Sequence, residues 1–153
     1  MKRSAGIALV LLLAVLLGAL REFFFLNLNY AIDHLANHRA YSFAHSSFQA
    51  AVQGMTLHDL VLLKWVAAAT FILAMFGLTL RMAHLLFGGH RYRSSIALLT
   101  AGIAGLALLL HLGSAVHPAL DLVSVKLLHL LQYPGMLLFL WMASMLRKPA
   151  NQG

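Results

Sequence analysis

The sequence contains no cysteine and few charged residues of either sign. Without cysteine the chain can form no disulfide, no thiolate metal site and no cysteine nucleophile. Only 10% of the 153 residues are charged, against about a quarter in a typical soluble domain, and 61% are hydrophobic. This composition excludes an ordinary soluble domain. It predicts a single integral membrane domain over residues 1–153, with no length left for a separate soluble catalytic domain.

Long apolar runs predict an all-α fold, specifically a four-helix transmembrane bundle. Each run reaches about 20 residues, the length that crosses the hydrocarbon core of a bilayer. The predicted spans are residues 4–23, 59–80, 94–112 and 119–146. The first run follows Lys2 and Arg3 as a signal peptide would, but no small residues occupy both positions of a cleavage site. We therefore expect it to remain as an anchor.

Two local signals mark a helix start and a bend. Thr56 is followed three residues later by Asp59, the pattern of a capping box, which predicts that the second long helix begins there. Pro134 and Gly135 lie inside the fourth run and predict a kink about halfway across the membrane. The sequence thus predicts that the second long helix starts at Thr56 and that the fourth span is kinked at Pro134.

A stripe of small residues follows the third predicted span. Ala97, Ala101 and Gly105 recur every four residues, a spacing that lets another helix backbone approach closely. We expect this stripe to pack against a helix of the same chain. A face that binds a partner is the alternative interpretation.

Lysine and arginine are distributed unevenly over the predicted loops. Placing both termini and the loop 81–93 on one side collects seven of the eleven basic residues, namely Lys2, Arg3, Arg81, Arg91, Arg93, Arg147 and Lys148. The other side holds the remaining four basic residues and all four acids. Because basic loops stay in the cytoplasm, we expect a bacterial inner-membrane protein with both termini cytoplasmic. The partner of these charges is then the lipid bilayer and not nucleic acid.

The only long connection is the predicted outer loop, residues 24–57, between the first and second spans. It is rich in aromatic residues, including Tyr30, Tyr41, Phe43 and Phe48. Such density argues against disorder and for a segment that lies in the headgroup region or folds onto the outward-facing mouth of the bundle. We expect short interfacial helices there.

Each predicted span carries one ionisable residue at the same depth. Counted from the cytoplasmic basic residue of its own span, each lies 17 or 18 residues away, and these residues are Arg21, Lys64, His111 and His129. At about 1.5 Å per residue the depth is about 26 to 27 Å, just inside the outer edge of the hydrocarbon. The rest of this outer polar layer consists of Glu22, His58, Asp59, His117, Asp121, Lys126 and Gln132.

Two interpretations of the outer polar layer stay open. Long basic side chains near helix ends reach toward the interface, so the layer can simply mark where each span leaves the membrane. Alternatively the groups converge between the helices and pair, for instance Glu22 with Lys64 or Lys126, into a binding surface that opens outward.

The nine histidines raise the question of a metal or haem site. His111 and His129 lie at matching depth on consecutive spans, as two axial haem ligands would. No His-x-x-His or Glu-x-x-His pair occurs, and no serine is surrounded by the Gly-x-Ser-x-Gly pattern of hydrolases. We therefore expect no cofactor, no metal and no catalytic site, with haem binding by these two histidines as the alternative.

Four short segments carry a resemblance to a known family: Arg21 to Phe24, Asn27 to Tyr30, Leu63 to Trp65 and Leu131 to Pro134. The chain resembles the small polytopic membrane proteins found beside exosortases in Bacteroidetes. The resemblance implies an accessory role in a system that processes C-terminal sorting signals at the inner membrane. Exosortases themselves use a catalytic cysteine, so none of their catalytic residues carries over to this cysteine-free chain.

The sequence therefore predicts a non-enzymatic inner-membrane accessory protein. It would engage another integral membrane protein through its outer face, in association with an exosortase-type sorting system. The alternative from a different class is a haem- or quinone-associated redox subunit that uses His111 and His129.

Overall fold

The computed structural model describes residues 3–88 and 92–146, and all regular secondary structure in these ranges is helical. The prediction of an all-α chain is confirmed for this part. The helices are α1 (Arg3–Ala36), α2 (Ser46–Ala51), α3 (Leu57–Phe87), α4 (Arg93–Gly113), α5 (Ala119–Gln132) and α6 (Gly135–Leu146).

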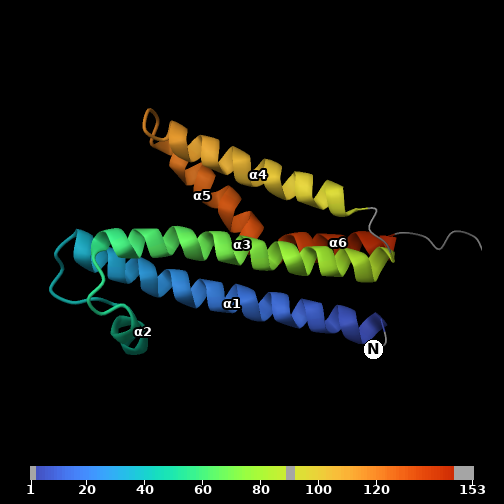
Figure 1. The fold of residues 1–153 in the computed structure, drawn as a ribbon, viewed down its shortest axis with the longest axis horizontal. Helices are drawn as coiled ribbons and strands as arrows, with labels where there is room; N and C mark the ends of the chain where they lie inside the picture. Colours follow the sequence, from blue (N-terminus) through green and yellow to red (C-terminus); the bar gives the residue numbers. More distant parts are fainter. Residues whose placement is uncertain (1–2, 89–91, 147–153) are drawn as a thin grey trace, which may run out of the picture.

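Helix α3 is the centre of the arrangement, since it contacts α1, α4, α5 and α6. Helix α1 runs alongside it in the opposite direction, and α4 and α5 form a hairpin that leans away from this pair (Figure 1). Helix α6 follows the second half of α3. The main apolar cluster packs α1, α3 and α6 together and consists of Val10, Ala14, Met75, Met82 and Leu137.

Three helices, α1, α3 and α4, are long and apolar enough to cross a membrane. Helices α5 and α6 together pass the same test as a fourth, bent crossing. Many large apolar side chains on these helices are exposed, among them Leu73 at 68% and Leu98 at 77%. Water would disfavour such surfaces and lipid would not, so the structure indicates an integral membrane protein.

Helix α1 is longer than the first predicted span, and the predicted loop 24–57 is wrong in its first part. The helix continues past residue 23 to Ala36, because Phe25, Leu28 and Ala31 recur at helical spacing and are buried. They bury one face of α1 against α3 and the connecting segment. Its 34 residues exceed the length that the hydrocarbon core of a bilayer requires.

The rest of the connection folds back onto α1. The side-chain amide of Asn27, 5% exposed, donates to Phe23 O at 2.7 Å and accepts from His45 N at 2.5 Å. The short helix α2 follows and places Phe48 edge-on against Phe24 at 5.5 Å between ring centroids. The expected short helix in this segment is therefore present.

Helix α3 begins where the capping box predicts. Thr56 accepts from Asp59 N at 3.3 Å, and the Asp59 carboxylate accepts from Thr56 N at 2.9 Å. The helix ends at Gly88, which has a left-handed backbone (φ 70°) that suits glycine. The predicted start of the second long helix is confirmed.

The predicted kink at Pro134 is also confirmed. Helices α5 and α6 meet at an angle of 56°, and Tyr133 at the junction has an extended backbone. Proline lacks the N–H for an intrahelical hydrogen bond, so the helix breaks there. Gly18 of α1 faces this junction, since a Cβ built on it would lie 3.7 Å from Pro134 Cδ. The bend lets α5 pack on α4 while α6 stays with α3.

The expectation that the small-residue stripe packs within the chain is wrong. Ala97, Ala101 and Gly105 are all exposed on α4. The buried residues of α4 are Ile96 and Ala107, on a different face. Helix α4 packs mainly on α5, so its stripe is left facing the surroundings.

The described basic residues of the predicted cytoplasmic set gather at one end of the bundle. Arg3 donates from Nε to Leu85 O at 2.6 Å and from Nη2 to Leu86 O, which caps the end of α3. Arg81 and Arg93 line a hollow between α3 and α4. The other members, Lys2, Arg91, Arg147 and Lys148, lie outside the described residues.

Candidate functional site

A cavity of about 390 Å³ lies between α1, α3 and α5, closed at one corner by His111 of α4. Its wall contains seven residues of the predicted outer polar layer, namely Arg21, Glu22, Lys64, His111, Asp121, His129 and Gln132. The remainder is mostly apolar and includes Phe25, Leu26, Val61 and Leu128. Glu22 and Leu26 are exposed, so the cavity reaches the surface. These seven predicted residues therefore converge on one cavity between the helices.

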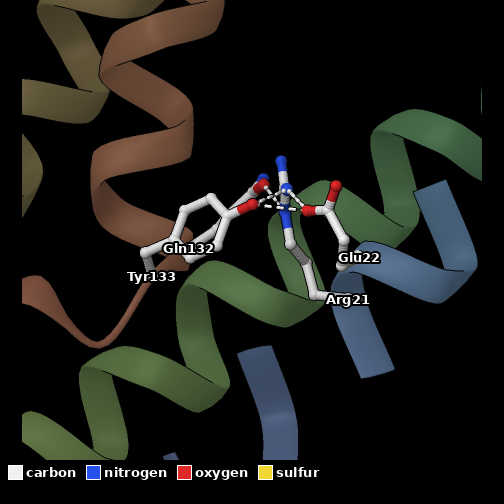
Figure 2. Close-up of polar contacts among 4 residues, drawn as sticks. All are labelled: Arg21, Glu22, Gln132 and Tyr133. Atoms are coloured by element: carbon white, nitrogen blue, oxygen red, sulfur yellow. Dashed lines mark hydrogen bonds and ion pairs between the residues drawn. The ribbon is translucent and has the colours of Figure 1, made fainter. Parts of the chain in front are cut away.

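Arg21 is the centre of a hydrogen-bond network in the wall of the cavity (Figure 2). Its Nε donates to Gln132 Oε1 at 2.9 Å. Its Nη1 donates to Glu22 Oε2 at 3.0 Å and to the Tyr133 hydroxyl at 2.9 Å. The Tyr133 hydroxyl in turn donates to Glu22 Oε2. The network thus joins α1 to the end of α5 through charge-assisted hydrogen bonds, which are stronger than neutral ones.

The guanidinium of Arg21 is almost fully enclosed, with 4% of its side chain exposed. Aromatic rings lie on it, with Cζ 5.0 Å from the Phe25 centroid and 4.7 Å from the Tyr133 centroid. A buried charge is costly unless it is paired and hydrogen-bonded, and Glu22 with the two rings supplies that compensation. A snorkelling arginine would expose its guanidinium, so the snorkelling interpretation does not describe Arg21.

Gln132 reaches Arg21 because α5 ends directly beside it. Gln132 is the last residue of α5 and is 2% exposed. Its Nε2 also donates to Ala68 O of α3 at 3.4 Å. Tyr133 lies between Gln132 and Pro134. The break at the proline directs its side chain toward α1, where the hydroxyl joins the network. The proline-containing junction therefore positions both partners of Arg21.

A second polar contact lies at the α4 corner of the cavity. His111 Nδ1 lies 2.8 Å from Asp121 Oδ1, which joins the end of α4 to the start of α5. The Trp65 ring of α3 contacts the same imidazole edge-on, at 4.9 Å between centroids. The side chain of Ser124 donates to Ala107 O at 2.7 Å and secures the same hairpin.

The predicted pairing of Glu22 with a lysine is wrong. Glu22 pairs with its neighbour Arg21, and no ion pair among residues 3–88 and 92–146 includes Lys64 or Lys126. The error arises because spacing along the sequence did not reveal that the neighbouring residues Arg21 and Glu22 pair with each other. Lys64 is left as a half-buried cation in the wall of the cavity.

A smaller cavity of about 180 Å³ adjoins the first one between α3, α4 and α5. The two share several wall residues, including Trp65, Ala68 and Leu128. Beyond the shared wall the smaller cavity is lined by Ala69, Ile72, Ala104, Ala107 and Leu108. A cavity lined by charged groups and a mainly apolar cavity therefore lie next to each other.

Four predicted residues are not part of the cavity. Asp59 caps α3, and His58, His117 and Lys126 are exposed around the same end of the bundle. For these four the interpretation as ordinary interfacial residues fits best. Tyr133 is the main residue that the sequence analysis missed as a site residue. The signal for it was its position beside Pro134, which turns its side chain toward α1.

One serine side chain lies close to a histidine. Ser47 Oγ lies 2.8 Å from His45 Nδ1, but His45 is the N-cap of α2 and also accepts from Ser47 N. This contact is a local helix cap. Within the described ranges no three His, Cys, Asp or Glu side chains gather as a metal site. The chain matches no protein-family model, no curated protein and no solved structure.

Proposed function

We propose that the chain is a non-enzymatic accessory protein of a bacterial inner membrane that engages another membrane protein through its outer face. In this proposal it crosses the bilayer four times, with α5 and α6 as one bent crossing and both termini in the cytoplasm. The grouping of Arg3, Arg81 and Arg93 at one end supports this orientation, because basic ends stay cytoplasmic.

The observation that carries the proposal is the charged cavity at the opposite end. Ionisable groups at membrane depth are costly and mark binding sites, and Arg21 is 3% exposed within an otherwise apolar bundle. A concave, mainly apolar wall with a few convergent polar groups is typical of a binding site. The carboxylates of Glu22 and Asp121 are each engaged by a cation or imidazole, which supports binding over acid-base chemistry.

The resemblance to exosortase-associated proteins supplies the proposed partner, an exosortase-type sorting enzyme or its substrate. The sorting reaction takes place on the outer side, where the cavity and the segment that carries α2 lie in this orientation. The connecting segment is tied to α1 through Asn27 and His45, so it offers a fixed surface to a partner.

Site-specific photocrosslinking tests the proposal. A photoreactive residue at Leu26, 48% exposed on the rim of the cavity, should form an adduct with the sorting enzyme or its substrate. The same residue at Leu109, 68% exposed on α4 and outside both cavities, is the matched control and should not. The proposal fails if Leu26 captures neither protein, or if both positions capture the same ones.

The redox alternative has one observation in its favour. His111 and His129 line the same cavity, and His111 has a carboxylate on Nδ1, as ligating histidines usually do. Haem bound there would give a Soret band that is lost in both His111→Ala and His129→Ala. Purified protein without such a band, from cells supplied with haem, would contradict this alternative.

A further inference from the structure

Two cationic groups in the cavity wall retain unused hydrogen-bond donors. Arginine has five N–H donors, and the contacts of Arg21 use Nε and Nη1. Nη2 has no acceptor in the part of the chain that the structure describes, and it carries no dashed line in Figure 2. Lys64, on the facing helix α3, has neither an ion pair nor a hydrogen bond to any residue within 3–88 and 92–146. The cavity therefore presents unsatisfied positive donors, which suit an anionic group such as a phosphate or carboxylate.

The carboxylates in the wall do not cancel this preference. Glu22 is occupied by Arg21 and Tyr133, and Asp121 is occupied by His111. One oxygen of each carboxylate, Glu22 Oε2 and Asp121 Oδ1, accepts these contacts, whereas Arg21 Nη2 and Lys64 have no acceptor among the described residues. Among the described residues of the wall, the charge left without an ion pair is therefore that of Lys64, which is positive.

The adjoining apolar cavity fixes the kind of molecule that carries the anionic group. Its wall is mostly apolar and includes Ala69, Ile72, Ala104 and Leu108. Two of its polar side chains already have partners, since Ser124 donates to Ala107 O and His111 Nδ1 contacts Asp121. A peptide placed there would leave its backbone N–H and C=O groups without partners, at high cost in an apolar environment. A hydrocarbon chain carries no such groups and fits.

We propose that the two cavities together bind an anionic lipid, with its headgroup on Arg21 Nη2 and Lys64 and one acyl chain between α3, α4 and α5. The ligand class follows from the two neighbouring cavities, one with unused cationic donors and the other mainly apolar. This inference rests on the membrane setting of the proposed function and does not depend on the protein partner.

The test is a binding titration with the full chain purified in a neutral detergent. The probes are phosphatidylglycerol, zwitterionic phosphatidylcholine, palmitate, inorganic phosphate and a short apolar peptide with a free C-terminal carboxylate. We expect phosphatidylglycerol and palmitate to bind, because both join an anionic group to an alkyl chain. Phosphatidylcholine should bind far more weakly, and inorganic phosphate alone should not bind.

Matched lysine variants locate the headgroup. Lys64→Gln should weaken the binding of phosphatidylglycerol by about tenfold, the effect of one charge-assisted contact. Lys126→Gln makes the same change on the exposed surface of α5 and should leave affinity within about twofold. Ala104→Phe fills the apolar cavity and should abolish lipid binding while the cations remain. Helical content and elution volume check the fold of each variant. If Ala104→Phe misfolds, the comparison of Lys64→Gln with Lys126→Gln still tests the site.

Several results would overturn the lipid site. These are equal losses for Lys64→Gln and Lys126→Gln, equal binding of phosphatidylcholine, or binding of inorganic phosphate as strong as that of phosphatidylglycerol. Tighter binding of the peptide would assign the cavity to a polypeptide terminus instead. Lipid binding without any photocrosslinked partner leaves this site standing and removes the accessory role, and the reverse result removes only the lipid site.

Discussion

The hydrogen bond between Arg21 and Gln132 gives a sharp test of the network, because one partner can be removed without changing side-chain bulk. Gln132→Leu deletes the acceptor of Arg21 Nε, 2.9 Å away, in a place where the glutamine is 2% exposed and the arginine side chain 4%. The guanidinium then keeps its charge with one further N–H, that of Nε, unpaired. Arg21→Met is the complementary change, and the double variant removes both polar partners.

The expected magnitude follows from the burial of the pair. Hydrogen bonds to charged groups contribute about 1.5–3 kcal/mol in soluble proteins, and polar contacts within membranes reach at most about 1.7 kcal/mol. Gln132→Leu should therefore lower the free energy of unfolding by about 1.5 kcal/mol. Replacing both partners by apolar residues leaves no orphaned group, so the double variant should lose about 1 kcal/mol less than the sum of the single variants.

Reversible unfolding in mixed micelles with a rising fraction of SDS measures these free energies. Gln53→Leu is the matched control, since Gln53 is exposed in the connecting segment and should change stability by no more than about 0.5 kcal/mol. If Gln132→Leu behaves like Gln53→Leu, or if the two single effects simply add in the double variant, the network does not hold α5 to α1 as described.

Three further predictions concern the cap, the bend and the topology. Thr56→Ala should cost about 1 kcal/mol in the same unfolding assay, because it removes the cap of α3, and no loss would contradict the capping box. Gly18→Ala should be tolerated, with its Cβ 3.7 Å from Pro134, whereas Gly18→Leu should lose about 1–3 kcal/mol, and equal stability of the two would refute this contact. In intact cells Ser47→Cys should react with an impermeant thiol reagent and Ser94→Cys should be protected; the opposite pattern inverts the proposed orientation.

The features that local chemistry determines were predictable from the sequence. A capping box at Thr56 and a break at Pro134 depend on a few neighbouring residues, and both are present. Counting residues from the basic end of each span was also useful in part. With a constant rise per residue it groups Arg21, Lys64 and His111, and these three line one cavity. Seven of the eleven predicted layer residues consequently share one cavity.

Features that depend on packing direction were not predictable in the same way. The first predicted span ends at residue 23, yet α1 continues because Leu28 and Ala31 repeat at helical spacing, a weaker signal than a continuous apolar run. The stripe of α4 shows the same limit, since Ala101 and Gly105 define a face but not its neighbour. Rotation of a helix about its axis is set by contacts with other helices, which a single sequence does not contain.

The 56° bend between α5 and α6 has a consequence for how the protein could diverge. The bend separates the walls of the larger cavity, because α5 runs from the end of α4 to α3 and the chain then follows α3 as α6 after Pro134 (Figure 1). Substitution of Leu128 or Val61 would therefore alter the ligand preference of the larger cavity while its walls stay apart. Such a scaffold allows specificity to drift under selection without rebuilding the bundle.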